Sequence, residues 1–588
     1  MKRFNLQNSK RNSALKVLML ILLFAFTSQI SFSQYQFKTY NTNCGGVSGT
    51  EFGRSIINRF DNGYAIAGYS YNAVCGIGPY DWMFTRIRPD GIHDLVKLIG
   101  TTSDDKCNSL IQSRVDKSYL LAGNMYDQNS LKNKATIVKL DNVGNLLYSR
   151  YIYDANASNY NQVVNDTADV RGLTGWSQKS GIFFKTRNRI LVTQYNTAGN
   201  LNWGYRYDSW ISTALQSNSI EEANSICYQP TSNTYGVAAK TNFYSGVTTS
   251  WDILLVNVNY SGAVIWKKVY KFNFANPNFY PSAVPTKIIP MTDGGFVVVG
   301  NTNAYFNGSS DIIVFRVSAN GTLIWSNTYG TTAALEYGNS IVSDVNFLTI
   351  AGYRKNTVAA ATDALLMKIP IGGGAPLWTR VYNPTTASEA GLDLVNSNTG
   401  AAGGYAVTGD ASFNLTDAFL WRTDVNGLIT GANCNNSITL SFVVNPVKLD
   451  SFLLVPVKVT DKAFNPTIVV PTMITNTYCQ GDNPEGSNEQ DNLNGEVTDF
   501  SLKQNYPNPF NPSTTIEFDI PASGFVSIKI FDISGKEVYT LVNTEVSAGR
   551  HKAEFNASGI STGVYSVSYT HLRAHETKAN LVCRLLLE

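Results

Sequence analysis

Five acidic residues recur at one position of a repeated sequence unit, and their carboxylates could do chemistry if the fold brought them together. Each stands four residues before a pair of the Ser-Ile type, as Glu51 stands before Ser55-Ile56. The five acids are Glu51, Asp105, Glu221, Glu336 and Glu389. A ring of such carboxylates on one face would bind a hard cation such as Ca²⁺, or a basic ligand. A second interpretation is that each acid accepts backbone N–H groups from the neighbouring unit and recurs because the unit recurs.

A second set of acids begins the third segment of several units and leaves the same two interpretations open. Its members are Asp81, Asp252, Asp311, Asp363 and Asp417. For this set we favour the structural interpretation, because carboxylates at turns commonly accept backbone N–H groups. Apart from Ca²⁺ at the first set, the sequence predicts no cofactor.

Patterns of the common catalytic sites do not occur. Outside residues 567–588 the only histidines are His93 and His551, which excludes a site built from several histidines. The H-E-x-x-H pattern and the P-loop are missing as well. Paired carboxylates for glycoside chemistry leave no local motif, so a hydrolase or lyase remains an alternative.

The composition and the first residues indicate a large exported protein. The chain has 588 residues, with 46 basic and 43 acidic side chains and a formal net charge of +3, so nucleic-acid binding is not expected. Basic residues followed by the apolar run 17–26 predict a signal peptide over residues 1–33. No other segment is apolar for about 20 residues, so we expect no transmembrane helix in the mature chain.

The elements that must position the acids are short strands in a repeated unit of about 52 to 60 residues. The clearest copies span residues 295–329 and 337–382, and seven copies fill residues 35–435. Each holds four strands, with Asp90-Gly91, Asn320-Gly321 and Asn426-Gly427 as hairpin turns between the third and fourth. Because one unit cannot bury both faces of its sheet, the units must stack in a ring. We predict a seven-bladed β-propeller.

Two further patterns concern how the blades pack and how the ring closes. Trp203, Trp266, Trp325 and Trp378 follow the turn glycine at one fixed spacing, which favours packing between blades over ligand stacking. The seventh unit lacks its fourth strand, and residues 35–42 have the sequence of that missing strand. We therefore predict that residues 35–42 form the outer strand of blade seven.

The segment after the propeller is divided into a β-rich part and a linker. Residues 436–480 predict a β-rich appendage, and the polar, unpatterned stretch 481–497 predicts a flexible linker. An exported chain permits disulfides, for which Cys434–Cys479 and Cys75–Cys107 are candidates, with Cys44 competing for Cys75. Cys227 lies in an apolar strand and is expected to be a buried thiol.

The C-terminal region alternates apolar and polar residues over 515–520 and 526–530, with a turn at 534–536, which predicts a small Ig-like β-sandwich over 498–566. It resembles the C-terminal sorting domain of type IX (Por) secretion cargo. The residues that carry the resemblance are Asn505, Pro507, Asn508, Pro509, Phe510, Gly535, Gly563 and Tyr565. The resemblance implies export through the periplasm to the medium or the outer-membrane surface, with the type IX machinery as partner, and removal of the domain there.

Residues 567–588 depart from the pattern of that family. Their two ends resemble one reading frame of a sequencing-library adapter. We therefore expect this segment to pack poorly or to extend as a tail with His571, Arg573 and His575 exposed, and we assign no site to His571, His575 or Cys583.

Taken together, these observations favour an all-β protein that is secreted or surface-attached and binds or scaffolds without catalysis. Its ligand is an extracellular glycan or protein that the sequence does not identify. The alternative is a polysaccharide-active hydrolase or lyase that uses carboxylates on one propeller face.

Overall fold

The computed structural model describes residues 37–587 apart from these gaps: 45–46, 73, 75, 90, 154–155, 180–186, 211–219, 243–249, 273–281, 305–309, 357–360, 383–387, 398–402, 413–415, 430–435, 438–440, 445–446, 451–452, 459–460, 464–466, 470–471, 479–500, 503–504, 506–509, 511, 521–523, 533–535, 548, 562 and 573–578. The chain forms two compact units, Met1–Gln490 and Asp491–Glu588, and each is described by itself. In the described part of the chain no helix is long and apolar enough to cross a membrane.

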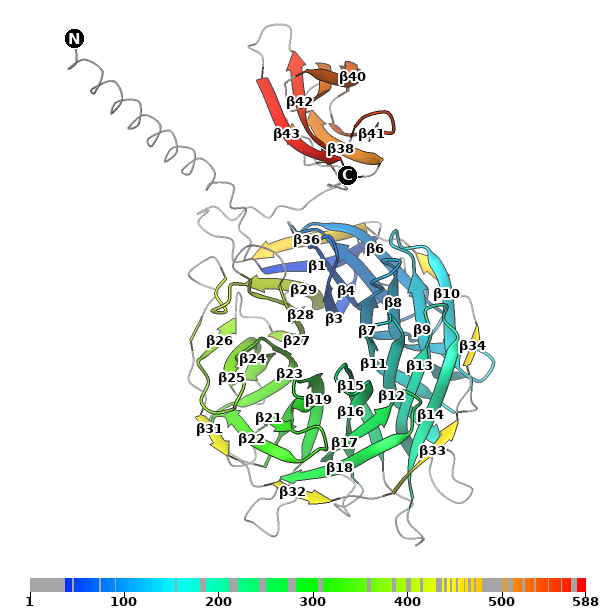
Figure 1. The fold of residues 1–588 in the computed structure, drawn as a ribbon, viewed down its shortest axis with the longest axis vertical. Coiled ribbons are helices and arrows are strands. Elements are labelled where there is room, and N and C mark those ends of the chain that lie inside the picture. Colours follow the sequence, from blue (N-terminus) through cyan, green and yellow to red (C-terminus); the bar gives the residue numbers. More distant parts are fainter. Residues whose placement is uncertain are drawn as a thin grey trace, which may run out of the picture. The chain divides into compact units, whose positions relative to one another are not determined.

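The first unit is a seven-bladed β-propeller, which confirms the predicted fold class (Figure 1). Each blade is an antiparallel sheet whose four strands run outward in chain order. Blades one to three are β3 (Thr50–Asn58), β4 (Tyr64–Tyr71), β5 (Asp81–Ile87), β6 (His93–Gly100); β7 (Lys106–Gln112), β8 (Tyr119–Asp127), β9 (Lys132–Leu140), β10 (Leu146–Ile152); β11 (Ser158–Asn165), β12 (Arg171–Lys179), β13 (Arg187–Tyr195), β14 (Leu201–Trp210).

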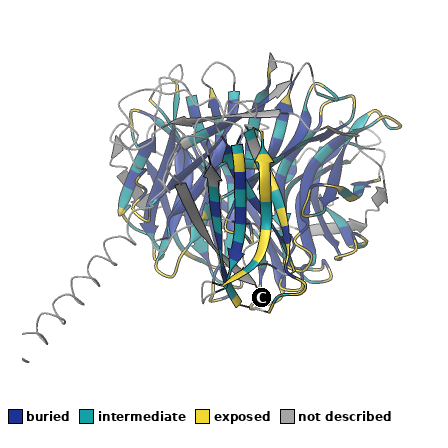
Figure 2. Ribbon diagram, turned by 90° about the horizontal axis from the view of Figure 1, so that it is seen from above, coloured by how far each residue is buried: buried dark blue, intermediate teal, exposed yellow. Residues whose placement is uncertain are grey.

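The remaining blades repeat this order. They are β15 (Glu221–Gln229), β16 (Thr234–Thr241), β17 (Asp252–Asn259), β18 (Val264–Phe272); β19 (Ala283–Pro290), β20 (Phe296–Thr302), β21 (Asp311–Val317), β22 (Leu323–Gly330); β23 (Leu335–Ser343), β24 (Phe347–Lys355), β25 (Thr362–Pro370), β26 (Trp378–Tyr382); and β27 (Ser388–Asn396), β28 (Tyr405–Ser412), β29 (Thr416–Thr423) with β1 (Phe37–Cys44). The core lies between neighbouring blades, so second and third strands are almost continuously buried (Figure 2).

Closure of the ring follows the predicted scheme. β1 pairs antiparallel with β29, from Phe37 opposite Trp421 to Tyr40 opposite Ala418. The Tyr40 hydroxyl donates a hydrogen bond of 2.8 Å to the carbonyl of Gly91 in the next blade. The last tyrosine of other outer strands makes the same bond, as Tyr270 does to Gly321 at 2.7 Å. The N-terminal strand therefore makes the contact that the outer strands of blades three to six make.

The recurring tryptophans pack between blades, as predicted. Trp266 of blade four lies against the turn glycine Gly321 of blade five, and its indole N–H donates to the carbonyl of Ala319 at 2.7 Å. Trp203, Trp325 and Trp378 lie against Gly262, Gly373 and Gly427 in the same way. These glycines have positive φ, so neither a side chain nor another backbone conformation would fit there.

Substituting one of these glycines should destabilise the ring at its blade junction. We expect Gly321→Ala to cost about 1–3 kcal/mol of unfolding free energy, because φ is 75° and an added Cβ would come within 2.8 Å of the Trp266 ring. Chemical denaturation monitored by tryptophan fluorescence measures this. Gly372→Ala is the control, since its Cβ would meet nothing within 4 Å; equal losses in both variants would contradict the argument.

Residues 436–478, where the sequence predicts an appendage, run around the outside of the ring and add a further strand to every blade. We call this segment the belt. Its strands visit the blades in reverse order, from blade six down to blade one and then blade seven: β30 (Asn436–Ser437), β31 (Ser441–Val444), β32 (Val447–Asp450), β33 (Leu453–Lys458), β34 (Asp461–Ala463), β35 (Thr467–Val469) and β36 (Thr472–Tyr478). Figure 1 shows these short strands on the perimeter of the propeller. The belt thus pairs the outer edges that a ring of separate sheets leaves open.

The second unit is a β-sandwich whose core matches the predicted alternation. One sheet holds β37 (Ser501–Leu502), β38 (Ser513–Ile520) and β41 (Gly549–Asn556); the other holds β40 (Glu537–Val546), β39 (Gly524–Phe531), β42 (Gly563–Leu572) and β43 (Ala579–Leu587). Ile516, Phe518, Ile528 and Ile530 are buried between the sheets.

The expectation of a poorly packed tail after residue 567 is wrong for the backbone. β42 continues to Leu572, with Val567 and Tyr569 buried in the core, and β43 pairs with it from Gly563 opposite Leu587 to His571 opposite Ala579. The free edge of β42 forms hydrogen bonds with the backbone of its partner strand. Many different sequences that alternate apolar and polar residues can form such a strand. Arg573 and His575 lie outside the described residues, and so do the side chains of His571 and Cys583.

Candidate functional site

The innermost strands carry a hydrogen-bonded ring around the propeller axis. Each has a register irregularity followed by an inward polar residue: Ser55, Ser109, Gln162, Ser225, Lys287, Ser340 and Asp393. The five links between consecutive blades from one to five, and from seven to one, are alike in kind. In each, the amide after this residue donates to the side chain of the preceding blade, as Ile288 does to Ser225 at 2.9 Å. The other such links end on Ser55, Ser109, Gln162 and Asp393.

Asp393 is the point where this ring gathers most bonds. Its carboxylate accepts the hydroxyls of Ser55 at 3.1 Å and Ser340 at 2.8 Å, and the amide of Ile56 at 3.1 Å. The ammonium of Lys287, two blades away, forms an ion pair with it at 3.1 Å. Lysine cannot accept a hydrogen bond, so Lys287 breaks the blade-to-blade pattern and reaches Asp393 instead.

The five recurring acids lie in the blade junctions rather than on an open surface. All five are 0% exposed. Asp105 accepts the amides of Thr101, in the loop from the preceding blade, and of Tyr126. Glu336 accepts the amide and hydroxyl of Thr331 and pairs with Arg354 at 3.1 Å, and Glu221 pairs with Arg189 at 2.9 Å. Asp105 and Glu336 thus accept backbone N–H groups of the loop from the preceding blade, as in the second interpretation given above, whereas Glu221 pairs with a side chain of that blade.

Burial gives these carboxyls unusual acidities. Burial raises the pKa of Glu51 to about 8, although Thr42 and Ser70 donate hydrogen bonds to it. Burial likewise raises the pKa of Asp105 to about 7 and that of Asp81 to about 6. Asp81, from the second set of acids, accepts hydrogen bonds from the amides of Ile77 and Gly78. The negative charge of Asp81 also raises the pKa of Asp105. Among the described residues no group of three or more His, Cys, Asp or Glu is placed to hold a metal ion.

The raised pKa values predict that the protein is more stable in mild acid than in base. Glu51, Asp105 and Asp81 bind protons more tightly when folded than their ordinary values of 4.5 and 3.8 allow when unfolded. Their contribution is therefore complete below about pH 4 and is lost as the pH rises through 6 to 8. We expect the unfolding temperature to fall between pH 5 and pH 9, as scanning calorimetry would show.

A matched pair of neighbours tests the cause of this pH dependence. Asp105→Asn removes a buried carboxyl, so the fall between pH 5 and pH 9 should become smaller. Asp104→Asn, at the exposed residue before it, should leave the profile unchanged. Identical profiles for the two variants would contradict the assignment.

An aromatic patch lies in blade one, where its first strand begins, its second ends and its third begins. We give this name to Phe52, Tyr69, Tyr71 and Tyr80. Phe52 stacks on Tyr69 with ring centroids 4.7 Å apart, Tyr80 meets Tyr69 edge-on at 5.8 Å, and Tyr71 meets Tyr80 at 5.7 Å. The patch is only partly buried, and Tyr71 is 45% exposed.

Two cations and one carboxylate border the aromatic patch. The guanidinium carbon of Arg54 is 5.0 Å from the Tyr69 centroid, and Lys106 Nζ is 5.3 Å from Tyr69 and 5.1 Å from Tyr80. Arg54 also donates to the Tyr69 hydroxyl at 2.7 Å and pairs with Asp410 of blade seven at 3.3 Å. Burial raises the pKa of Asp410 to about 6 in spite of Arg54. This arrangement offers ring faces, fixed positive charge and a hydrogen-bond acceptor within one small area.

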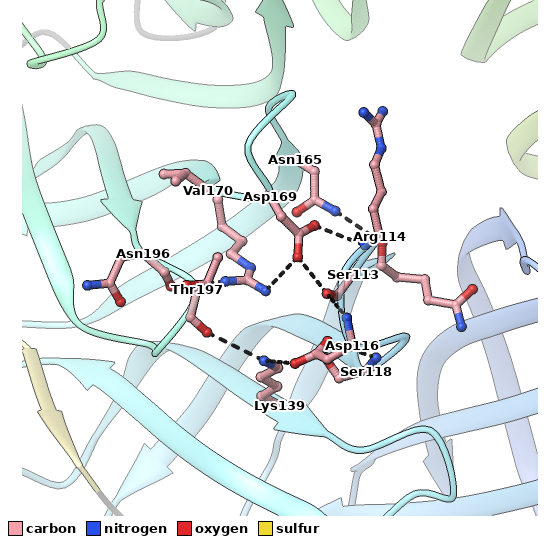
Figure 3. A network of polar contacts seen from close by, with 12 residues as sticks. Ser113, Arg114, Asp116, Ser118, Lys139, Asn165, Asp169, Val170, Asn196 and Thr197 are labelled. Carbon is pink, nitrogen blue, oxygen red and sulfur yellow. Dashed lines mark hydrogen bonds and ion pairs between the residues drawn. The ribbon is translucent and has the colours of Figure 1, made fainter.

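The opposite face, formed by the turns, carries a polar network between blades two and three (Figure 3). Asp169 accepts from the Ser113 hydroxyl at 2.5 Å and the Arg114 amide at 3.1 Å, and pairs with Arg171 at 3.3 Å. Lys139 donates to Asp116 at 2.7 Å. Burial opposes ionisation of Asp116, yet the bond from Lys139 holds its pKa well below the usual range. Both carboxylates, Asp169 and Asp116, are matched by a cation, and the bonds of Asp169 to Ser113 and Arg114 join blades two and three.

The cysteines agree only in part with the predictions. Cys227 is a free buried thiol, as expected. Cys107 is also free: its side chain points into the core of blades one and two, and burial raises its pKa to about 12, which corrects the proposed bond to Cys75. Cys75, Cys434 and Cys479 lie outside the described residues, as does the side chain of Cys44.

The sorting-motif residues lie in the second unit where the structure describes them. Asn505 is buried and donates to the Thr514 hydroxyl at 2.8 Å, and Phe510 and Tyr565 are part of the sandwich core. Gly563 begins β42. Pro507, Asn508, Pro509 and Gly535 lie outside the described residues.

Sequence reasoning missed both the axial ring and the aromatic patch. The axial residues follow the glycine of the repeated pattern, as Ser55 follows Gly53 and Ser340 follows Gly338, so their recurrence was a usable signal. The sequence signal for the aromatic patch was weaker. Phe52 and Tyr337 each directly follow a recurring acid, but the tyrosines on which they stack lie on the next strand.

The seven sheets closed in a ring and the separate sandwich define a propeller protein with a C-terminal β-domain. Residues 504–582 match the family described as the secretion system C-terminal sorting domain. The second unit is therefore a type IX sorting domain, and the protein is secreted or attached to the cell surface. A comparison with curated proteins finds no match.

Solved structures similar to the chain share little sequence with it. One is an endo-arabinase from Bacteroides thetaiotaomicron, with 12% identity and a TM-score of 0.23, over 45% of this chain and 92% of the other. Another is a glycoside hydrolase family 43 arabinoxylan arabinofuranohydrolase from Bacillus subtilis in complex with cellotetraose, with 10% identity and a TM-score of 0.25, over 91% and 94%. Likeness at this level assigns no activity.

Proposed function

We propose that the propeller is a non-catalytic binding or scaffold module, delivered to the cell exterior by the sorting domain. The observation that carries this is the contrast between its two sets of polar groups. The recurring acids are buried and bonded within the blade junctions, whereas the aromatic patch with Arg54 and Lys106 is partly exposed. Aromatic rings with a few convergent polar groups are typical of binding sites.

Binding and cleavage assays on the same protein test this proposal. The purified full chain is applied to an array of glycans and extracellular proteins, and the same glycans are assayed for new reducing ends. We expect binding without release of reducing ends. Cleavage that a single acid substitution abolishes would overturn the proposal.

One observation favours the alternative, a polysaccharide hydrolase or lyase. At neutral pH Glu51, with a pKa near 8, would be mostly protonated and Asp105, with a pKa near 7, about half protonated, and a general acid must be protonated to act. Both are 0% exposed, however, so a substrate could reach them only after the blade junction opened. Loss of cleavage in Glu51→Gln or Asp105→Asn, with folding retained, would establish this second function.

A further inference from the structure

We propose that the aromatic patch binds an acidic polysaccharide, with sugar rings stacked on tyrosines and the anionic group paired with Lys106. The proposal rests on the binding function above and names its ligand class. It is carried by three features of the described residues: partly exposed aromatic rings, an ammonium without an ion pair, and a second aromatic pair at the equivalent position of blade six.

The most exposed ring of the patch is that of Tyr71, and Tyr80 beside it is partly exposed. They follow one another around the loop between β4 and β5, and their centroids are 5.7 Å apart with planes inclined by 54°. Behind them, Phe52 and Tyr69 stack and hold Tyr80 in place. A pyranose ring has one apolar C–H face, which suits such a platform because the stacked ring loses little hydration there.

The charge beside the rings selects among ligands. Arg54 is engaged by Asp410 and by the Tyr69 hydroxyl. Lys106 contacts only the faces of Tyr69 and Tyr80 and has no ion pair within the described part of the chain. Its ammonium is therefore the group left to pair with a carboxylate or sulfate. A cationic ligand would meet two positive charges already on the ring faces and is disfavoured.

A polymer with repeating rings is favoured by a second aromatic pair. Tyr337 and Tyr353 of blade six stack with centroids 4.5 Å apart, and they occupy the positions that Phe52 and Tyr69 occupy in blade one. Blade seven, which carries Asp410, separates the two pairs. Two stacking platforms with a polar blade between them suit a chain of sugars better than a single ring or an acidic peptide, which lacks regularly spaced rings.

Titration of the full chain with defined oligosaccharides tests the proposal. The probes are hexamers of galacturonate, mannuronate and hyaluronan, with cellohexaose and xylohexaose as neutral probes and hexaglutamate as the acidic peptide. We expect the acidic sugars to bind tightest and to weaken as salt rises. Lys106→Met and Tyr71→Ala should each weaken binding about tenfold. Tyr337→Ala should weaken binding of the acidic hexamers more than binding of the corresponding disaccharides, which are titrated beside them.

Matched variants separate this site from the rest of the surface. Lys117→Met is the control for Lys106, because Lys117 also lies over an aromatic ring, 3.7 Å from the Phe60 centroid, but in a turn on the opposite face. Tyr153→Ala is the control for Tyr71, since Tyr153 is exposed to a similar degree, 58%. Both should bind as the parent does. Circular dichroism and unfolding temperature verify folding in every variant.

The outcomes distinguish failure of the ligand assignment from failure of the proposed function. Neutral sugars or hexaglutamate binding as tightly as the acidic sugars, or binding unchanged in Lys106→Met and Tyr71→Ala, would overturn the assignment and leave a binding protein with another site or ligand. No binding to any acidic sugar overturns it as well. Cleavage of a probe would overturn the non-catalytic function itself.

Discussion

A chain in which residues 436–478 are replaced by a Gly/Ser segment of equal length should unfold at a lower temperature than the parent and should self-associate. The belt pairs the outer strand of every blade, so its removal leaves seven sheet edges with unpaired N–H and C=O groups. At about 1 kcal/mol net for each lost hydrogen bond, the loss is on the order of 5 kcal/mol or more. Calorimetry measures the stability, and size-exclusion chromatography with light scattering measures the association.

The largest local effect should appear at the N-terminal strand. β36 pairs with β1 from Phe37 to Asn43, whereas β29 pairs with it only from Phe37 to Tyr40. Without the belt, Asn41 and Thr42 lose their strand pairing altogether, and Asn43 keeps only its pairing with Ser48. Hydrogen exchange of residues 37–44 should therefore accelerate more than exchange of inner strands such as β3 and β7.

The neighbouring linker supplies the control for this prediction. Residues 481–497 have a polar, unpatterned sequence, and replacing them by Gly/Ser of equal length should change neither stability nor association. If the belt replacement behaves like the linker replacement, the belt strands do not stabilise the ring. If the belt replacement is less stable but stays monomeric, the outer sheet edges of the blades are protected from association by something other than the belt.

The propeller was predictable because its signals are local and repeated. Turn glycines at positive φ, tryptophans at a fixed spacing and the buried second and third strands each follow from a few neighbouring residues. Closure was predictable for the same reason: Tyr40 occupies in residues 35–42 the position that Tyr329 occupies in its own blade.

The belt and the site were harder to predict because their partners are distant in sequence. Belt strands are short, such as Asn436–Ser437 and Asp461–Ala463, and have no repeat, so only the ring edge determines where they pair. The recurrence of the acids was visible in the sequence, but the sequence could not distinguish an exposed ring of carboxylates on one face from buried positions in the blade junctions. That distinction depends on burial of Glu51 or Asp105 by two blades at once.

Asp393→Ser should be the most damaging single substitution in the axial ring. It removes the carboxylate that accepts from Ser55, Ser340 and Ile56, and it leaves the Lys287 ammonium without its ion-pair partner. Breaking such a largely buried, multiply bonded charge costs about 3–5 kcal/mol. Urea denaturation of the full chain measures the loss. Ser109→Ala, which removes the acceptor of a single 3.2 Å bond from the Val163 amide, should cost about 1 kcal/mol.

A double-mutant cycle with Lys287 tests whether the ion pair or the hydrogen bonds from Ser55, Ser340 and Ile56 account for more of the stability that Asp393 contributes. Serine occupies four of the seven axial positions, so a chain with both Lys287→Ser and Asp393→Ser has a ring built almost wholly from the common link. Its loss should be smaller than the sum of the two single losses by about 1–3 kcal/mol, because the stranded ammonium is gone. Additive losses would show that Lys287 and Asp393 act independently. An Asp393→Ser loss no larger than that of Ser109→Ala would remove Asp393 from its central place in the ring.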